Sequence, residues 1–189
     1  MVALLQYLHN IYPLSEGLKE HLLRIVKSKK IKKRDFLLKA GRKCEHIYFI
    51  EEGLLRCFYI TNKNEVSSWF MKEGDLAISI KSFFEQQPSY ESIQALEDCY
   101  LYFISYKELQ WIYHHFPEFN FVGRVLTERY YNLCDQRLYA IRMHSAPERY
   151  EYLVQNFPDL IKRIPGTHIA SYLGITFETL SRIKAKRKG

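Results

Sequence analysis

The chain has 189 residues and a formal net charge of +7, and 47% of its residues are hydrophobic. That hydrophobic content is enough for one large domain or two small ones with real cores. The basic excess favours an anionic partner, although charge alone does not separate a nucleic-acid-binding protein from a basic enzyme. No secretion signal and no apolar run of about 18 residues is present, so we expect a cytoplasmic protein without a membrane segment.

The sequence contains no recognisable catalytic or metal-binding pattern. Its cysteines are Cys44, Cys57, Cys99 and Cys134. They are scattered without a C-x-x-C pair, so we expect buried free thiols rather than a zinc site, an iron–sulfur cluster or disulfides. His114 and His115 are adjacent and would point different ways on a helix, which makes them poor joint ligands. We therefore expect no enzyme, no metal and no identifiable cofactor.

The first half of the chain changes from a helical to a strand pattern. Residues 2–27 have apolar side chains at helical spacing, and Pro13 and Gly17 interrupt them, which predicts two short helices. The basic run at residues 27–34 is typical of a solvated strand edge. From residue 31 to residue 105, short β-prone segments alternate with glycine turns. This pattern predicts an antiparallel barrel or double-sheet roll.

Helical spacing returns after Ser105, with helices predicted over 107–116, 118–143 and 146–156. The long helix has a seam in alternating steps of four and three, the coiled-coil spacing. The seam residues are Val122, Leu126, Arg129, Leu133, Gln136, Ala140 and Met143. A second stripe consists of Tyr130, Cys134, Leu138 and Ile141. A helix apolar on two sides predicts contacts with its own domain and with a second copy, and a single core helix is the alternative.

Residues 166–185 predict a helix-turn-helix. Its apolar positions are Ile169, Ala170, Leu173, Ile175, Leu180 and Ile183. Gly174 falls where the first helix must end in a left-handed residue, and Thr176 is a good N-cap for the second helix. An ordinary αα-hairpin is the alternative interpretation.

The side of the second helix away from its apolar face suits contact with bases. The predicted base contacts are Phe177, Glu178, Ser181 and Arg182. Arg182 can pair with the two acceptors of guanine, and Glu178 can accept from the cytosine amino group. The predicted phosphate contacts are Thr167, His168, Thr176, Lys184, Lys186 and Arg187. They combine cationic side chains with groups at helix N-termini, although His168 could equally be a plain surface histidine.

With this order of elements, the chain resembles the Crp/Fnr family of bacterial transcription regulators over nearly its whole length. The segment 48–53 is similar to the family's strand and glycine turn, and Gly74-Asp75 to the start of its phosphate-binding cassette. The resemblance implies an α+β fold: a cyclic-nucleotide-binding-type β-roll at 1–116, a dimerisation helix at 117–143 and a helix-turn-helix domain at 144–189. It also implies a homodimer on a near-palindromic site in double-stranded DNA, with RNA polymerase as a partner.

The cassette departs most from the family pattern. A cyclic-nucleotide site needs a carboxylate for the ribose hydroxyl and an arginine for the cyclic phosphate. By spacing, those positions are Ser79 and Ser89. The residues of this degenerate pocket are Gly74, Asp75, Ser79, Ser89 and Tyr90. We do not expect cyclic AMP to bind, and the effector is unknown. A roll filled by Phe83, Phe84 and Tyr90 is a further expectation.

Family members also continue into a small β-wing, whereas this sequence ends at Gly189. We expect the phosphate contacts of a wing to be missing or to come from residues 184–188. The leading hypothesis is a homodimeric, sequence-specific transcription regulator. The alternatives are a β-roll sensing or protein-interaction module with a vestigial helix-turn-helix, and a cyclic-nucleotide-gated regulator. The operator, and activation versus repression, stay open.

Overall fold

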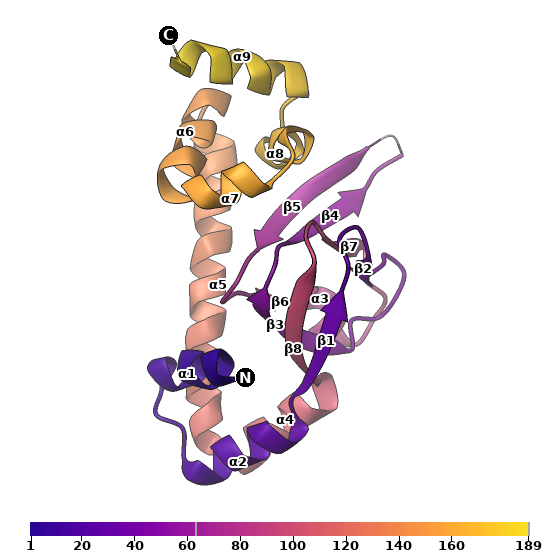
Figure 1. Cartoon of the computed structure of the whole chain (residues 1–189), viewed down its shortest axis with the longest axis vertical. Helices are drawn as coiled ribbons and strands as arrows, with labels where there is room; N and C mark the ends of the chain where they lie inside the picture. Colours follow the sequence, from indigo (N-terminus) through magenta and orange to yellow (C-terminus); the bar gives the residue numbers. More distant parts are fainter. Residues whose placement is uncertain (63, 189) are drawn as a thin grey trace. The chain divides into compact units, whose positions relative to one another are not determined.

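The computed structural model describes residues 1–62 and 64–188 and has the predicted α+β class, with an antiparallel β-roll followed by helices (Figure 1). The chain forms two compact units. The first contains Met1–Cys57 and Phe70–Arg129, and the second contains Phe58–Trp69 and the residues from Tyr130 onward. The long helix is divided between the units. The predicted division into 1–116, 117–143 and 144–189 follows the order of elements instead, and it stays a prediction.

The roll consists of two antiparallel sheets. The strands are β1 (Lys27–Ile31), β2 (Phe36–Leu38), β3 (His46–Glu52), β4 (Leu55–Ile60), β5 (Glu65–Met71), β6 (Leu76–Ala77), β7 (Glu91–Ala95) and β8 (Cys99–Ser105). One sheet has the order β1-β8-β3-β6 and the other β2-β7-β4-β5. In the first, Tyr48 pairs with Phe103, and the register shifts between Ile50 and Glu52. The short strand β6 carries too few residues to show a strand pattern in the sequence.

The roll closes around alternating apolar side chains and a tight glycine turn. Ile50 of β3 and Leu101 of β8 are completely buried. Between β3 and β4, Gly53 has a φ of +103°, in the region that favours glycine. A Cβ at this position would lie 2.6 Å from both the Asp98 carbonyl oxygen and Cys99 Sγ. Gly53 therefore serves two needs, a left-handed turn and a close approach of two chain segments.

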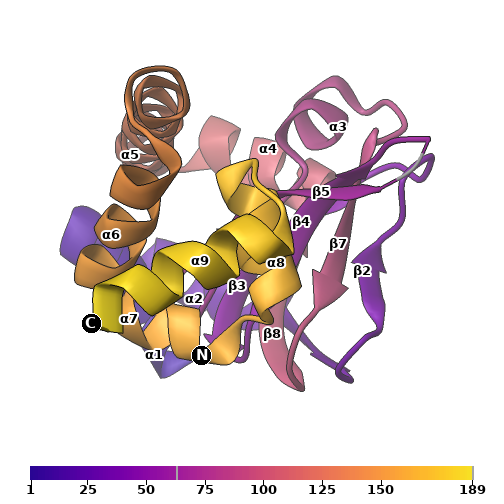
Figure 2. The same ribbon diagram turned by 90° about the horizontal axis from the view of Figure 1, so that it is seen from above.

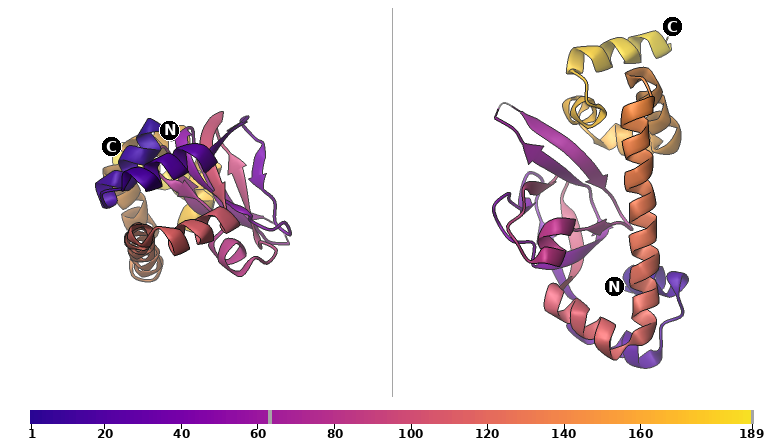
Figure 3. Two further views of the ribbon diagram at one scale, coloured as in Figure 1. Left: turned by 90° about the horizontal axis from the view of Figure 1, so that it is seen from below. Right: turned by 180° about the vertical axis from the view of Figure 1, so that it is seen from behind.

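Capping side chains define the helices of the first unit, which are α1 (Val2–Ile11), α2 (Glu16–Ile25), α3 (Ile80–Glu85), α4 (Tyr106–His115) and the beginning of α5 (Pro117–Met143). The two predicted N-terminal helices are confirmed, but Gly17 lies inside α2 because Ser15 already caps that helix through the Leu18 amide. Ser105 and Glu108 form a capping box on α4. The helix α5 runs without interruption (Figure 3).

The second unit contains the rest of α5 and the helices α6 (Ala146–Asn156), α7 (Pro158–Arg163), α8 (Gly166–Leu173) and α9 (Phe177–Lys188). Ser145 and Glu148 form a capping box at the start of α6. The small core of this unit includes Tyr150, Ile169 and Leu180. Figure 1 shows α8 end-on while α9 lies across the view, and Figure 2 shows the same pair from above. The end of the chain at Gly189, on which the expectation about the wing rests, lies outside the described residues.

The cysteines and the helices bear on the other expectations. Cys44, Cys57 and Cys99 are buried free thiols, as predicted, and Cys134 is half-buried. Within the described part of the chain, no helix combines the length and the apolar character that crossing a membrane requires.

We expect Gly53→Ala to destabilise the protein more than Gly41→Ala. Both glycines have positive φ, +103° and +82°, and nothing lies within 4 Å of a Cβ at Gly41. Each substitution should cost about 1–2 kcal/mol through backbone strain. At Gly53 the close contacts should add about 1–3 kcal/mol. Urea unfolding of both variants measures the difference, and equal losses would contradict the close packing at Gly53.

Candidate nucleic-acid interface and roll interior

The turn between α8 and α9 has the geometry that the sequence predicts. Gly174 ends α8 with φ 69° and ψ 34°, in the left-handed region. The Ile175 amide then donates to the Ala170 carbonyl at 3.0 Å. Thr176 caps α9 by accepting from the Thr179 amide at 3.2 Å. Ala170 and Leu180 are almost completely buried between the helices. These contacts fix α9 relative to α8.

Two arginines hold the C-terminal end of α8, and sequence reasoning missed both. Arg137 of α5 donates to the Tyr172 carbonyl at 3.2 Å, and its guanidinium lies 3.6 Å from the centre of the Tyr172 ring. Arg149 of α6 donates to the Leu173 carbonyl at 2.9 Å. The last carbonyls of a helix lack intrahelical donors, so cationic donors are well placed there. Only the three-dimensional structure shows that these arginines reach α8.

The outer face of α9 presents polar groups to solvent. Glu178, Ser181 and Arg182 are all exposed. Hydrogen bonds from its own backbone amide and from Thr176, together with the nearby Arg182 charge, lower the pKa of Glu178. Glu178 is therefore an anionic acceptor at neutral pH. Arg182 donates to Thr179 Oγ1 at 3.1 Å, so its guanidinium is held along the helix. This face can offer both an acceptor and a multiple donor to base edges.

Phe177 is half-exposed and has a packing role besides its predicted contact with a base. A Cβ added to Gly166 would lie 2.8 Å from Phe177 Cε2. The aromatic ring therefore packs over the first residue of α8. This contact joins the N-terminal ends of the two helices, and a larger residue at position 166 would displace the ring.

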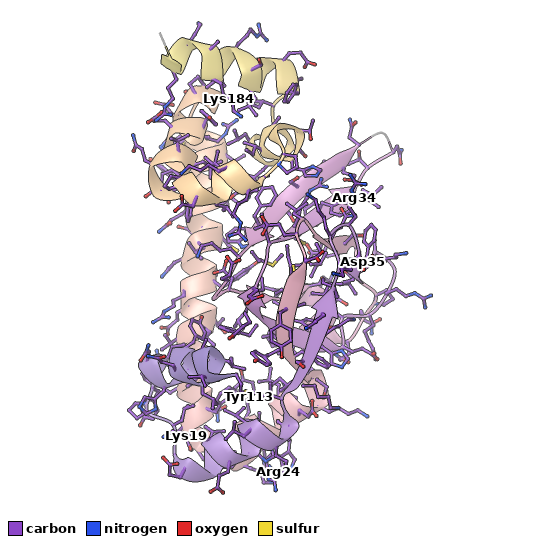
Figure 4. The ribbon with its side chains drawn as sticks, viewed as in Figure 1. Lys19, Arg24, Arg34, Asp35, Tyr113 and Lys184 are labelled. Atoms are coloured by element: carbon purple, nitrogen blue, oxygen red, sulfur yellow. The ribbon has the colours of Figure 1, made fainter. Side chains whose placement is uncertain are left out.

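The predicted phosphate contacts differ in how they are placed. Lys184, labelled on α9 in Figure 4, is half-buried with its ammonium 5.9 Å from the Tyr150 ring centre. Arg187 forms an ion pair of 2.9 Å with Glu151. Both side chains therefore contact α6. Lys186 and Thr167 are exposed, whereas His168 is half-buried. Thr176 is exposed and also caps α9.

In the roll interior, the two positions selected by spacing come together. Ser79 Oγ and Ser89 Oγ are 2.9 Å apart, and both residues are buried. Ser89 donates to the Glu91 carbonyl at 2.8 Å, so its single hydroxyl proton is used and Ser79 donates to Ser89. Two neutral hydroxyls thus satisfy each other where a cyclic-nucleotide site would need opposite charges.

A buried carboxylate lies beside these serines, and the sequence analysis missed it. Cys57 Sγ of β4 donates to Glu91 Oε2 of β7 at 2.8 Å, and both residues are buried. The only available sequence signal was the position of Glu91, two residues after Ser89. The pair joins two neighbouring strands of the same sheet through their side chains.

Two other predicted pocket residues, Gly74 and Asp75, form hydrogen bonds within the chain. Gly74 donates from its amide to the Ile50 carbonyl at 2.9 Å, and the Asp75 carbonyl accepts from the Ile50 amide at 3.0 Å. Burial raises the pKa of Asp75, whose carboxylate accepts from the Lys72 amide. The expectation of an aromatic-filled interior holds for Phe83, which is fully buried. It is wrong for Phe84 and Tyr90, which are 50% and 57% exposed and therefore face solvent.

The exposure of the predicted dimer seam increases along α5. Val122 is completely buried within its own chain, so it belongs to the core rather than to a surface seam. Burial raises the pKa of Tyr7 of α1 and the nearby positive charge of Arg129 opposes this rise, so Arg129 lies close to α1 of its own chain. Leu126 and Ala140 are half-buried and Gln136 is exposed. Leu133 and Met143, by contrast, are 43% and 65% exposed. The apolar residues offered to solvent thus lie on the C-terminal half of the helix.

No group of three or more His, Cys, Asp or Glu side chains that could hold a metal ion occurs among residues 1–62 and 64–188.

Comparison with known proteins agrees with this geometry. Residues 28–116 match the family model of the cyclic nucleotide-binding domain. No curated protein sequence matches the chain. Among solved structures, FixK2 from Bradyrhizobium japonicum is 15% identical with a TM-score of 0.74, covering 86% of this chain and 84% of its own.

Two further structures are similar over most of their length. The c-di-GMP-responsive global regulator CLP from Xanthomonas campestris is 15% identical with a TM-score of 0.72, covering 92% of each chain. A putative regulator of the Crp/Fnr family from Eubacterium rectale is 17% identical with a TM-score of 0.72, covering 95% of this chain and 88% of its own.

These matches show the fold of the chain. Residues 28–116 are similar to the cyclic nucleotide-binding domain family. Together with the helices that follow, the chain has the fold of the Crp/Fnr transcription regulators, as the resemblance predicted.

Proposed function

We propose that the protein is a homodimeric, sequence-specific DNA-binding transcription regulator of the Crp/Fnr type. The observation that carries this proposal is the outer face of α9, where Glu178, Ser181 and Arg182 are exposed beyond a well-formed turn at Gly174. An exposed acceptor and an arginine on the first turns of such a helix suit base edges in the major groove.

The predicted phosphate contacts differ in their exposure and in the contacts that each side chain already makes in the free protein. Lys186 and Thr167 are exposed and suit direct contact with phosphate. Lys184 and Arg187 contact α6, so they support the position of α9 as well as its charge. The family fold supports RNA polymerase as a further partner and a cytoplasmic location.

Dimerisation would use the exposed C-terminal half of α5. Leu133 and Met143 lie on the predicted seam, separated by one heptad and one further step of three residues. Both are substantially exposed. A second copy would cover them. Two recognition helices would then enter successive major grooves roughly 34 Å apart, which requires a near-palindromic site.

The roll interior would not take cyclic AMP. A buried cyclic phosphate needs a cationic partner, because an uncompensated buried charge is costly. Ser79 and Ser89 are neutral and bonded to each other, and the neighbouring carboxylate of Glu91 would repel a phosphate. The effector, if the roll takes one, has different chemistry.

We expect Arg182→Ala to change sequence preference and Lys186→Ala to weaken all sequences alike. Both substitutions remove one positive charge from α9. Loss of a base contact should cost about 1–3 kcal/mol at the preferred site, whereas loss of a phosphate contact should lower the salt slope by about 1. Selection of duplexes from a random pool at two salt concentrations measures both effects. Motif-free binding that Arg182→Ala leaves unchanged would contradict the proposal and favour a vestigial helix-turn-helix.

We expect Leu133→Lys to weaken the dimer and Tyr131→Lys to leave it intact. Tyr131 is 71% exposed and lies off the seam, so it controls for the added charge. Burying a leucine contributes about 1.5–3 kcal/mol, so the dimer dissociation constant should rise by about tenfold or more. Sedimentation equilibrium measures it. Equal effects of the two substitutions would place the interface elsewhere.

We expect saturating cyclic AMP to leave the melting temperature unchanged. A ligand that binds only the native state stabilises it by about 2.7 kcal/mol at one hundred times its Kd, which a thermal melt detects readily. AMP without the cyclic phosphate serves as the matched control. An upshift specific to cyclic AMP would support the cyclic-nucleotide-gated alternative instead.

A further inference from the structure

Thr179 lies one turn before Arg182 on α9, and the sequence analysis gave it no role. Its side chain is half-buried. The Arg182 guanidinium donates from Nη2 to Thr179 Oγ1 at 3.1 Å. On its other side, Thr179 Oγ1 lies 3.2 Å from the hydroxyl oxygen of Thr176, the N-cap of α9. Thr179 therefore connects the predicted guanine contact to the residue that caps the helix.

The protons of these groups can be assigned from what each group is able to donate. An arginine side chain has no acceptor, so Thr179 Oγ1 accepts from Arg182. Thr176 Oγ1 accepts from the Thr179 amide at 3.2 Å. In the remaining contact, between the two hydroxyls, either threonine could donate. The choice depends on a third group, the carboxylate of Glu178.

Glu178 settles the direction of the chain of hydrogen bonds. Its pKa is lowered by its own backbone amide, by the Thr176 hydroxyl and by the Arg182 charge. An anionic carboxylate can only accept hydrogen bonds, so Thr176 turns its proton toward Glu178. Thr179 then supplies the donor in the contact between the two hydroxyls. The result is a directed chain that starts at the Arg182 guanidinium, passes through both threonine hydroxyls and ends at the Glu178 carboxylate.

The chain arranges both predicted base contacts before DNA arrives. Glu178 and Arg182 are exposed, and ordering long exposed side chains at an interface normally costs free energy. Thr179 accepts only one of the N–H groups of Arg182, so the others stay available for the two acceptors of guanine. Hydrogen bonds in a connected series also polarise one another, so the loss of a central member weakens the rest. Thr179 is that central member.

We propose that Thr179 is a positioning residue whose hydroxyl links the Arg182 guanidinium to the N-cap and the Glu178 carboxylate, so that the two base contacts form one preformed unit. This unit presents a donor pair for guanine and an acceptor for the cytosine amino group at a fixed spacing. Thr179 acts through Arg182 rather than through a contact of its own with DNA. The inference rests on the proposed DNA-binding function and adds the residue that makes the two base contacts interdependent.

The first test compares Thr179→Val with Thr179→Ser in the full-length protein. Valine keeps the branched shape of threonine without the hydroxyl, and serine keeps the hydroxyl. The readout is the ratio of affinities for two duplexes, the one selected by the wild-type chain and the same duplex changed at the base pair whose preference Arg182→Ala removes. Thr179→Val should lower this ratio about two- to tenfold, the range of one net hydrogen bond, and Thr179→Ser should keep it. An unchanged ratio in the valine variant would overturn the proposal.

Combining Thr179→Val with Arg182→Ala separates positioning from direct contact with DNA. If Thr179 acts through Arg182, the valine substitution should not change the ratio further once position 182 is alanine. A further loss in that background would mean that Thr179 contacts a base itself. A phosphate contact of Thr179 would instead weaken both duplexes alike and leave the ratio unchanged in either background. Both of these results would overturn the proposal while leaving the DNA-binding function intact.

A second readout needs no DNA. Titration of Glu178, followed by NMR, reports on the chain of hydrogen bonds in the free protein, because bonds and positive charges at a carboxylate lower its pKa. Thr179→Val should raise the pKa of Glu178 toward its ordinary value, and Thr179→Ser should leave it low. The reason is that Arg182 loses its tether and Thr176 loses a donor. An unchanged titration in the valine variant would overturn the inference. If selection yields no preferred duplex, the proposed function fails, and this titration still decides whether Thr179 joins the two side chains.

Thr127→Val is the matched control. Thr127 is exposed on α5, and its hydroxyl donates to the Gly123 carbonyl at 2.9 Å within its own helix. The substitution removes a helix-surface hydroxyl of the same kind from another helix. The affinity ratio and the titration of Glu178 should both equal the wild-type values. Changes as large as those in Thr179→Val would mean that the loss of any such hydroxyl has these effects, and would overturn the role of Thr179.

Discussion

The end of α8 is the constraint on which the C-terminal unit depends. A helix of this length cannot satisfy its last carbonyls by itself, and α8 must stop at Gly174 for α9 to begin. Arg137 and Arg149 supply cationic donors to these carbonyls. Hydrogen bonds with a charged partner are stronger than neutral ones, typically about 1.5–3 kcal/mol. The orientation of α9 is therefore set in part by contacts of α8 that α9 itself does not make, in addition to its own contacts with α8 and α6.

The roll interior follows a different physical rule. A charged pair that waits for a ligand must stay solvated or be compensated when the ligand is absent. Here Ser79 and Ser89 are neutral, and Glu91 accepts from a thiol. The polar groups satisfy one another inside the fold, so a closed interior costs little. Backbone hydrogen bonds hold the Gly74 turn to Ile50, and the two positions at which the family resemblance implies charged side chains carry Ser79 and Ser89.

Local patterns predicted most elements, because caps and turns act over a few residues. Gly174 and Thr176 each mark an element boundary that the structure shows at that residue. The helices α3 and α7 and the strand β6 are too short for periodicity to identify them. Spacing selected Ser79 and Ser89 as pocket positions, and the structure brings their hydroxyl oxygens within 2.9 Å of each other, although their role in a pocket stays a prediction.

The failures concern side chains whose partners are distant in sequence. Ser171 bonds to residues more than one hundred positions away, and nothing in its neighbourhood distinguishes it from a surface serine. Val122 continues the heptad pattern although it is completely buried, because the same spacing serves a core and a seam. The sequence of α9 did not indicate that two of its basic residues, Lys184 and Arg187, would contact α6.

Those two contacts have a consequence for how the protein would respond to salt. The salt dependence of DNA binding counts only the cations that replace condensed counterions on phosphate, with a slope of about −0.9 per contact. Arg187 already neutralises Glu151 and Lys184 rests on Tyr150. A phosphate that recruited Arg187 would leave Glu151 uncompensated beside the duplex. The counterion release of a complex with DNA would therefore be smaller than the number of basic residues on α9 suggests, and recognition would retain more of its strength as ionic strength rises.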